Sequence, residues 1–240
     1  MQRYPSAPSY WFKPLHFHFD DGFGALGDAF QEAALCLEGL LEEKQFINSY
    51  LPLAYLYRHA VELYLKSLII IVHRALRLPF GTQPSSAPAS IQTEEGWTPI
   101  SFVHSVSKLY GYLKTLIDAN RRELLVASKS DCIPLPEELP HWIALIETFD
   151  RRSTFFRYPG VGGAEQAPFR GSSSGAILSS EAPEPRPTEA SIGFNEGEQV
   201  IGVFYRDRSG LNDLLAVLKS AADELSILHF GLRCDLAGGE

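Results

Sequence analysis

The stretch from Tyr50 to Leu78 constrains the fold of this chain more than any other. It contains no glycine, and its one proline, Pro52, sits where a first helical turn tolerates proline. Apolar residues recur at the spacing of a buried helix, at Leu53, Leu56, Tyr57, Ala60, Val61, Tyr64, Leu68, Ile71 and Val72. Further apolar residues lie outside that stripe, at Leu63, Leu65, Ile69 and Ile70. A helix that is apolar nearly all round belongs at the centre of a bundle or in a membrane.

The charged residues of this stretch decide between these two environments. Arg58, Glu62 and Lys66 interrupt it too densely for a membrane span, because charges near the middle of a bilayer are costly. They are spaced i, i+4, i+8 and therefore share one line along the helix. Buried charges must be paired. We therefore expect the central helix of a bundle with a charged seam, which either fixes the packing of the helices or forms a polar groove for a ligand.

Composition sets the broad class of the protein. A chain of 240 residues with 45% hydrophobic and 12% aromatic residues can bury a core as one domain. The net charge of -8 argues against general coating of nucleic acid or binding to an anionic membrane, although it allows a local basic patch. Three cysteines in no CxxC arrangement, together with an N-terminus that shows no secretion signal, indicate a reducing compartment. We expect a cytoplasmic protein.

The remaining chain predicts an all-α, up-and-down bundle of about five helices. Besides the central helix, periodic segments predict helices over residues 21–45, 101–125, 136–150 and 210–232. Residues 79–99 are predicted to form a loop, and 190–194 with 199–205 a small β-hairpin. An N-terminal arm covers residues 1–21. Residues 160–189 are rich in Gly, Ser, Pro and Ala, and predict a flexible, disordered insert.

The first predicted helix shows an apolar face with acidic residues mostly opposite. Its apolar members are Leu26, Phe30, Ala33, Ala34, Leu37, Leu40 and Leu41, and the acids are Asp28, Glu32, Glu38 and Glu42. We expect the apolar face to pack on the bundle. The preceding pair, Asp20 and Asp21, is interpreted as ordinary surface carboxylates.

Sequence signatures of catalysis and cofactor binding are scarce. The chain has no GxGxxG, GxxxxGK, HExxH or GxSxG motif. His16 and His18 form a His-x-His pair, but no further ligand follows at zinc spacing. We therefore expect neither a metal nor a cofactor.

Three motifs, taken together, resemble the HEPN superfamily (higher eukaryote and prokaryote nucleotide-binding). The run Tyr57–Lys66, YRHAVELYLK, is similar to the signature of its second helix. His104, ahead of Leu109 and Tyr110, is similar to the histidine that opens the next helix. Asp150, Ser153 and the run Phe156-Arg157-Tyr158-Pro159 resemble the ending of a subset of bacterial members. The resemblance covers the helical body and not the arm or the insert.

The resemblance implies an all-α bundle, often dimeric, of the kind found in prokaryotic defence and toxin–antitoxin systems. Active members are metal-independent RNases in which a histidine serves as acid or base and an arginine four to six residues earlier steadies a phosphate. This chain has no arginine at that distance before any histidine. Members without the pair are thought to bind nucleotides, nucleic acid or proteins.

The sequence supports three hypotheses about function. The first is a binding or interaction module, not an enzyme, whose groove holds RNA, a nucleotide or a partner protein and is lined by Arg58, Glu62, Lys66, His104, Asp150, Arg157 and Tyr158. The second is a metal-independent ribonuclease with a non-standard site, in which His59 or His104 is the acid/base. The third is a structural subunit in which the same charges are only buried salt bridges. We expect a protein partner, with a homodimer and RNA or nucleotide binding as further expectations, and no membrane.

Overall fold

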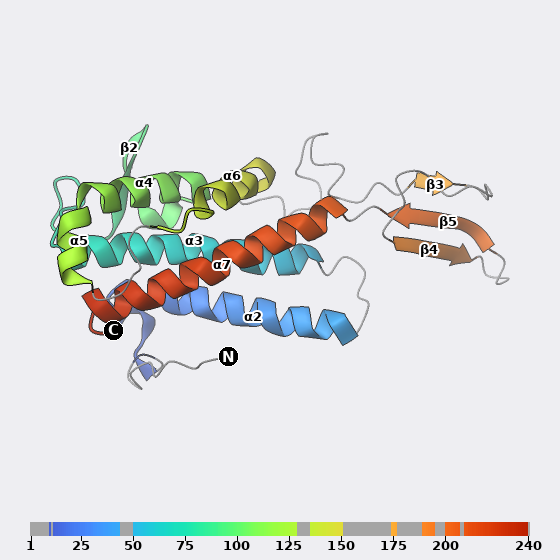
Figure 1. Ribbon diagram of the computed structural model, residues 1–240, viewed down its shortest axis with the longest axis horizontal. Coiled ribbons are helices and arrows are strands. Elements are labelled where there is room, and N and C mark those ends of the chain that lie inside the picture. The colour runs from blue at the N-terminus through green and yellow to red at the C-terminus, as the bar shows by residue number, and fades with distance from the viewer. Residues whose placement is uncertain are drawn as a thin grey trace.

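The computed structural model describes residues 10, 12–43, 50–128, 135–150, 174–176, 189–194, 200–206 and 209–239. Side chains are described for residues 10, 12–40, 50–128, 135–150 and 212–239. In these parts of the chain the prediction of a mostly helical bundle is confirmed (Figure 1).

The central helix is α3, Tyr50–Ala75, as the sequence predicts. It lies between α2, Phe23–Glu43, and α7, Ser209–Leu236, on one side, and α4, Val106–Ala119, and α6, Leu139–Asp150, on the other (Figure 1). Almost every residue of α3 from Tyr57 to His73 is buried. Its apolar side chains form the core that these four helices share.

The direction of the helices does not alternate strictly along the chain. Glu62 contacts His104 just before α4, and His73, three turns further along α3, contacts Tyr112 in α4. These two contacts show that α3 and α4 run in the same direction. The chain returns between them through residues 76–105, in which Phe80, Ala89 and Ile91 are buried.

This return contains structure that the sequence did not predict. Strands β1, Ser90–Thr93, and β2, Gly96–Pro99, form an antiparallel hairpin where we predicted a loop. A short 3-10 helix, η2, Ile100–Phe102, follows it. The third predicted helix is also divided, because α5, Arg121–Ala127, starts after a break at Asn120. A further 3-10 turn, η1, Leu15–Phe17, lies in the N-terminal arm.

The one hairpin that the sequence predicts, at residues 190–194 and 199–205, is present. Strands β4, Glu189–Phe194, and β5, Val200–Arg206, pair antiparallel with a register shift at Gly193 and Phe194. Strand β3, Ser174–Ala176, adds to the other edge of β5. Apart from β3 and Glu189, the predicted flexible insert 160–189 lies outside the described residues.

Helix α2 packs with only part of the predicted face: Ala34 is fully buried, and Phe30 and Leu37 pack against the core as predicted. Leu26, Ala33 and Leu40 are exposed, whereas Gln31 is buried and Glu38 contacts Tyr57 of α3. The prediction was wrong for Leu26, Ala33 and Leu40, because α3 and α7 offer polar partners to the acids and the amide of α2.

Candidate functional site

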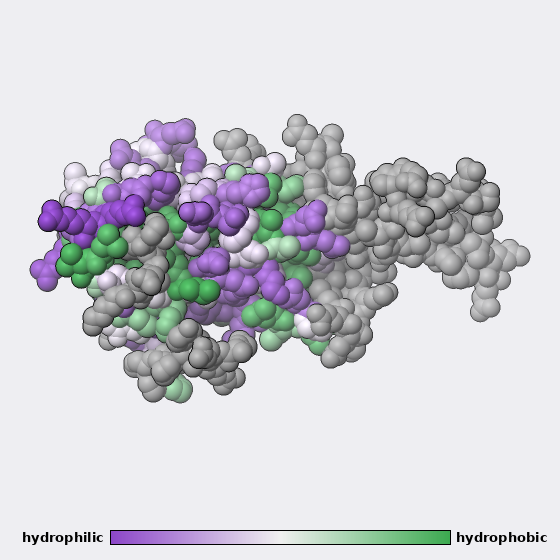
Figure 2. All heavy atoms as spheres, viewed as in Figure 1, coloured by the Kyte–Doolittle hydropathy of each residue, from purple (hydrophilic) through white to green (hydrophobic). Residues whose placement is uncertain are grey.

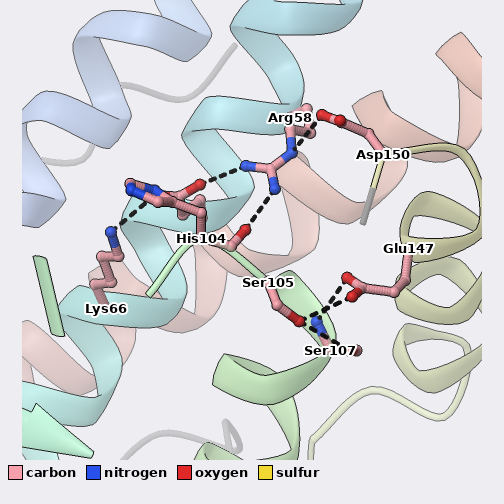
Figure 3. Close-up of polar contacts among 8 residues, drawn as sticks. Arg58, Lys66, His104, Ser105, Ser107, Glu147 and Asp150 are labelled. Atoms are coloured by element: carbon pink, nitrogen blue, oxygen red, sulfur yellow. Dashed lines mark hydrogen bonds and ion pairs between the residues drawn. The ribbon is translucent and has the colours of Figure 1, made fainter. Parts of the chain in front are cut away.

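The charged seam lies inside the bundle. The side chains of Arg58, Glu62 and Lys66 are exposed by only 0, 1 and 3%. Their spacing places them on one face of α3, and that face is covered by the segment that leads into α4 and by the end of α6 (Figure 3). The structure therefore brings together five of the predicted site residues, the other two being His104 and Asp150.

Arg58 is held from three sides. Its Nη1 donates to Glu62, its Nη2 donates to the backbone carbonyl of His104 at 2.5 Å, and its Nε lies 3.1 Å from Asp150 Oδ2. The planar guanidinium can satisfy three partners in fixed directions, which a lysine ammonium cannot do in the same way. Arg58 thus joins α3, the start of α4 and the last residue of α6.

Glu62 is the acidic centre of the seam. Its Oε1 lies 2.8 Å from Lys66 Nζ and 3.0 Å from His104 Nδ1, and Arg58 reaches its other oxygen. Burial alone would raise the pKa of this carboxyl, but the charges of Lys66 and Arg58 and the hydrogen bonds from Lys66 and His104 lower it to about 2. Glu62 is therefore a carboxylate at neutral pH.

The seam is balanced in charge. Two cations, Arg58 and Lys66, face two carboxylates, Glu62 and Asp150, all of them buried. This pairing removes the large cost of an isolated buried charge. It also leaves Arg58 engaged on all three nitrogens, so that it has no side open to a phosphate in this arrangement.

His104 is the member of the seam that reaches the surface. Its side chain is 50% exposed, although Nδ1 is held by Glu62 and its carbonyl by Arg58. Val103 before it is buried in extended backbone, so Phe102 and His104 flank an anchored residue and both point outward. Phe102 is 74% exposed. Phe102 and His104 are thus two exposed ring-bearing residues, separated by one buried residue.

The next residue fixes this segment to α6. Ser105 caps α4 by accepting from the backbone N–H of Lys108 and donates its own hydroxyl to Glu147 at 2.8 Å. The same carboxylate accepts from the backbone N–H of Ser107 (Figure 3). Side-chain and backbone contacts thus hold the short segment from His104 to Ser107.

Other candidates fall elsewhere. His59 lies against α2, edge-on to Phe30 at 4.4 Å and stacked on Tyr55 at 5.6 Å between ring centres, and does not join the seam. Arg157 and Tyr158 lie outside the described residues, so their place in the groove stays a prediction. No group of three or more His, Cys, Asp or Glu side chains suited to a metal occurs in the described part of the chain.

A second buried polar cluster escaped the sequence analysis. Asp20, interpreted as a surface residue, is 1% exposed and accepts from Ser67 of α3 at 2.5 Å and from the backbone N–H of Gly24 at 2.6 Å. The ring of His229, in α7, lies 3.7 Å from the same carboxylate oxygen. Burial would raise the pKa of Asp20, but the hydrogen bonds and the charge of His229 lower it well below its usual range. A sequence signal existed, because Asp20 directly precedes the predicted helix 21–45, where a capping residue is expected.

Beside it, Asp28 is surrounded by tyrosines. The hydroxyl of Tyr64 lies 2.9 Å from Asp28 Oδ1, and that of Tyr10 lies 3.5 Å from the other oxygen. Burial raises the pKa of Asp28 above its ordinary value. Arg233 of α7 stacks on the Tyr10 ring at 3.7 Å, which ties the N-terminal arm to the C-terminal helix.

No family model, curated protein or solved structure matches this chain. No helix among the described residues is both long enough and apolar enough to cross a bilayer.

Proposed function

We propose that this chain is a HEPN-like binding module of a prokaryotic defence or toxin–antitoxin system, which holds RNA or a nucleotide through Phe102 and His104 without cleaving it. The class and setting rest on the sequence resemblance. One observation supports the mode of binding: the buried charges satisfy one another, while His104, anchored to them, is half exposed and follows the exposed Phe102 by two residues.

Aromatic and imidazole rings on a fixed segment suit unstacked bases. Every base has a flat face, and stacking on an aromatic side chain contributes about 1–3 kcal/mol per base. The anchoring of His104 by Glu62 and Arg58 lowers the ordering cost that binding has to overcome. The buried seam thus serves as the support of the binding surface and not as its lining.

The metal-independent ribonuclease is the second candidate. A specific observation favours it: with Nδ1–H donating to Glu62, Nε2 of His104 becomes the basic nitrogen, as in carboxylate–histidine pairs of acid/base sites. Arg58 argues against it, because a phosphate would have to displace Glu62, the His104 carbonyl or Asp150 from the guanidinium.

A labelled single-stranded RNA, incubated with the protein in EDTA, tests these proposals. We expect binding, measured by fluorescence anisotropy, without cleavage on a gel. Phe102→Ala and His104→Ala should each weaken binding roughly tenfold, as the loss of one stacking contact implies. Phe12→Ala removes another exposed aromatic ring, 87% exposed on the N-terminal arm, and should leave binding unchanged.

Other results decide between the remaining readings. Cleavage that disappears in a folded His104→Ala protein would replace the binding module with the ribonuclease. No affinity for RNA or nucleotide, with the variants folded, would contradict the proposal and leave a protein-interaction module or a structural subunit with buried salt bridges only.

A further inference from the structure

A cavity of about 170 Å³ lies between the second half of α4, the first residue of α5 and the segment that leads into α6. Helix α4 supplies one wall, because Tyr110, Lys114 and Asp118 follow one another at intervals of four residues and share one face. Arg121, the first residue of α5, continues this wall, and residues 135–140 form the opposite one. The cavity shares no residue with the charged seam or with the segment that carries His104.

The cavity has an apolar floor. Two of its residues belong to the buried core, and the other three come from the approach to α6; they are Tyr110, Ile117, Leu135, Pro136 and Pro140. An apolar cavity of about 150 Å³ is enough to hold one benzene ring. The floor therefore has room for one aromatic or branched aliphatic side chain.

Four charged side chains line the same cavity, and their charges cancel. Lys114 and Asp118 are paired with each other at 2.5 Å. Among the residues that the structure describes, neither Arg121 nor Glu137 has a side-chain hydrogen bond or ion pair. The cavity thus offers a ligand one guanidinium, with its fork of N–H donors, and one carboxylate.

We infer that this cavity binds a free α-amino acid with an apolar side chain, of which phenylalanine and leucine are the types. The ligand's carboxylate accepts from Arg121, its ammonium donates to Glu137, and its side chain enters the apolar floor. Arginine suits the first role because its guanidinium can hold a carboxylate through two parallel hydrogen bonds. The inference does not rest on the RNA or nucleotide proposed for Phe102 and His104.

The balance of charge selects a zwitterion over other small ligands. A simple anion would lie against the carboxylates of Asp118 and Glu137, and a simple cation would lie against Lys114 and Arg121. A neutral apolar molecule would remove water from Arg121 and Glu137 without giving either charge a partner. A zwitterion gives each of these two groups a partner of opposite charge.

The mouth of the cavity is open to water. Lys114 and Asp118 are 54 and 55% exposed. Figure 2 shows hydrophilic side chains, in purple, beside apolar surface, in green, at the end of the bundle where Figure 1 places α4 and α5. Because the charged head of the ligand stays partly solvated, we expect a dissociation constant on the order of 1 mM.

Titration of the ¹⁵N-labelled full chain with phenylalanine, followed by NMR, tests the site. We expect saturable shifts confined to the amides of residues 110–121 and 137–143. Arg121→Gln and Glu137→Gln should each weaken binding roughly tenfold, since each removes one charge-assisted contact. Arg122→Gln and Glu138→Gln change exposed neighbours that do not line the cavity, and both proteins should bind as the wild type does.

Analogues of the ligand test its chemistry without altering the protein. N-acetylphenylalanine lacks the ammonium group, phenylalanine amide lacks the carboxylate, and glycine lacks the apolar side chain. Each should bind at least roughly tenfold more weakly than phenylalanine. The inference is overturned by unsaturable or absent shifts with both phenylalanine and leucine, by shifts centred elsewhere, or by equal losses in the neighbour variants. Undiminished binding of N-acetylphenylalanine would also overturn it, since the cavity would then be a site for simple anions.

Discussion

Arg58 shows how a single side chain can organise a core. A fully buried guanidinium is tolerated because two carboxylates and one carbonyl surround it. Each of those acceptors belongs to a different part of the bundle. The arginine therefore converts a costly buried charge into a specific junction of α3, α4 and α6.

Replacing Arg58 tests how strongly this junction stabilises the fold. Arg58→Met keeps much of the side-chain volume but leaves Glu62 and Asp150 without their shared cation. Because an unpaired buried charge remains, we expect a loss of about 3–5 kcal/mol in the free energy of unfolding. Urea denaturation measures it. Lys114→Ala, which removes a surface ion pair with Asp118 that solvent screens, should shift the midpoint only slightly. Equal effects of the two changes would contradict a special role for Arg58.

Sequence reasoning located this seam but not the second buried cluster, around Asp20. The i, i+4 spacing of Arg58, Glu62 and Lys66 required that they share a face, and burial required that they be paired. Asp20 was misjudged because its partners, Ser67 and His229, come from distant helices. No local pattern reports such contacts, since they depend on which helices become neighbours.

At the scale of the element, α2 shows why an amphipathic pattern does not fix orientation. Its apolar stripe predicts a core face, yet its inner side carries Gly24, Gly27 and Gln31. The glycines allow a close approach, since a Cβ at Gly27 would lie 2.9 Å from the ring of Tyr64. Polar contacts with α3 and α7 are added to the packing of Phe30 and Leu37 against the core.

Gly24 provides the test of this close approach. A Cβ there would overlap the imidazole of His229 and lie 2.7 Å from Asp20 Oδ2. Gly24→Ala should therefore destabilise the protein by about 1–3 kcal/mol, as overpacking does. Gly111→Ala in α4 meets open space and should stabilise by about 0.5–1 kcal/mol, because alanine restricts the unfolded chain. Thermal or urea unfolding of both proteins gives the comparison. A stabilising Gly24→Ala would show that α2 and α7 are not in close contact here.

At the scale of the whole molecule, two buried carboxylates link the elements on different sides of α3. Glu62 joins α3 to the approach to α4, and Asp20 joins the N-terminal arm to α3 and α7. Both have pKa values below the ordinary range for their type. Protonation of either group removes contacts that hold different helices together, so their titration affects the entire bundle.

Acid unfolding should reveal this coupling. A depressed pKa contributes stability that is present above the unfolded value, 4.5 for Glu62, and is lost as the pH falls toward about 2. Asp20 acts in the same direction, whereas burial raises the pKa of Asp28 and Asp223, whose contribution is present at low pH and lost as the pH rises.

We expect the free energy of unfolding to fall steeply below pH 4.5, because the two depressed groups sit at the helix junctions. Glu62→Gln should lower stability at neutral pH and flatten the acid slope, since the glutamine has no proton to gain. Urea titrations across this pH range measure both effects, with Glu123→Gln, an exposed change on α5, as the control. An acid slope that is the same in wild type and Glu62→Gln would mean that the seam does not control acid stability, and that the decline arises from the Asp20 cluster or from net charge.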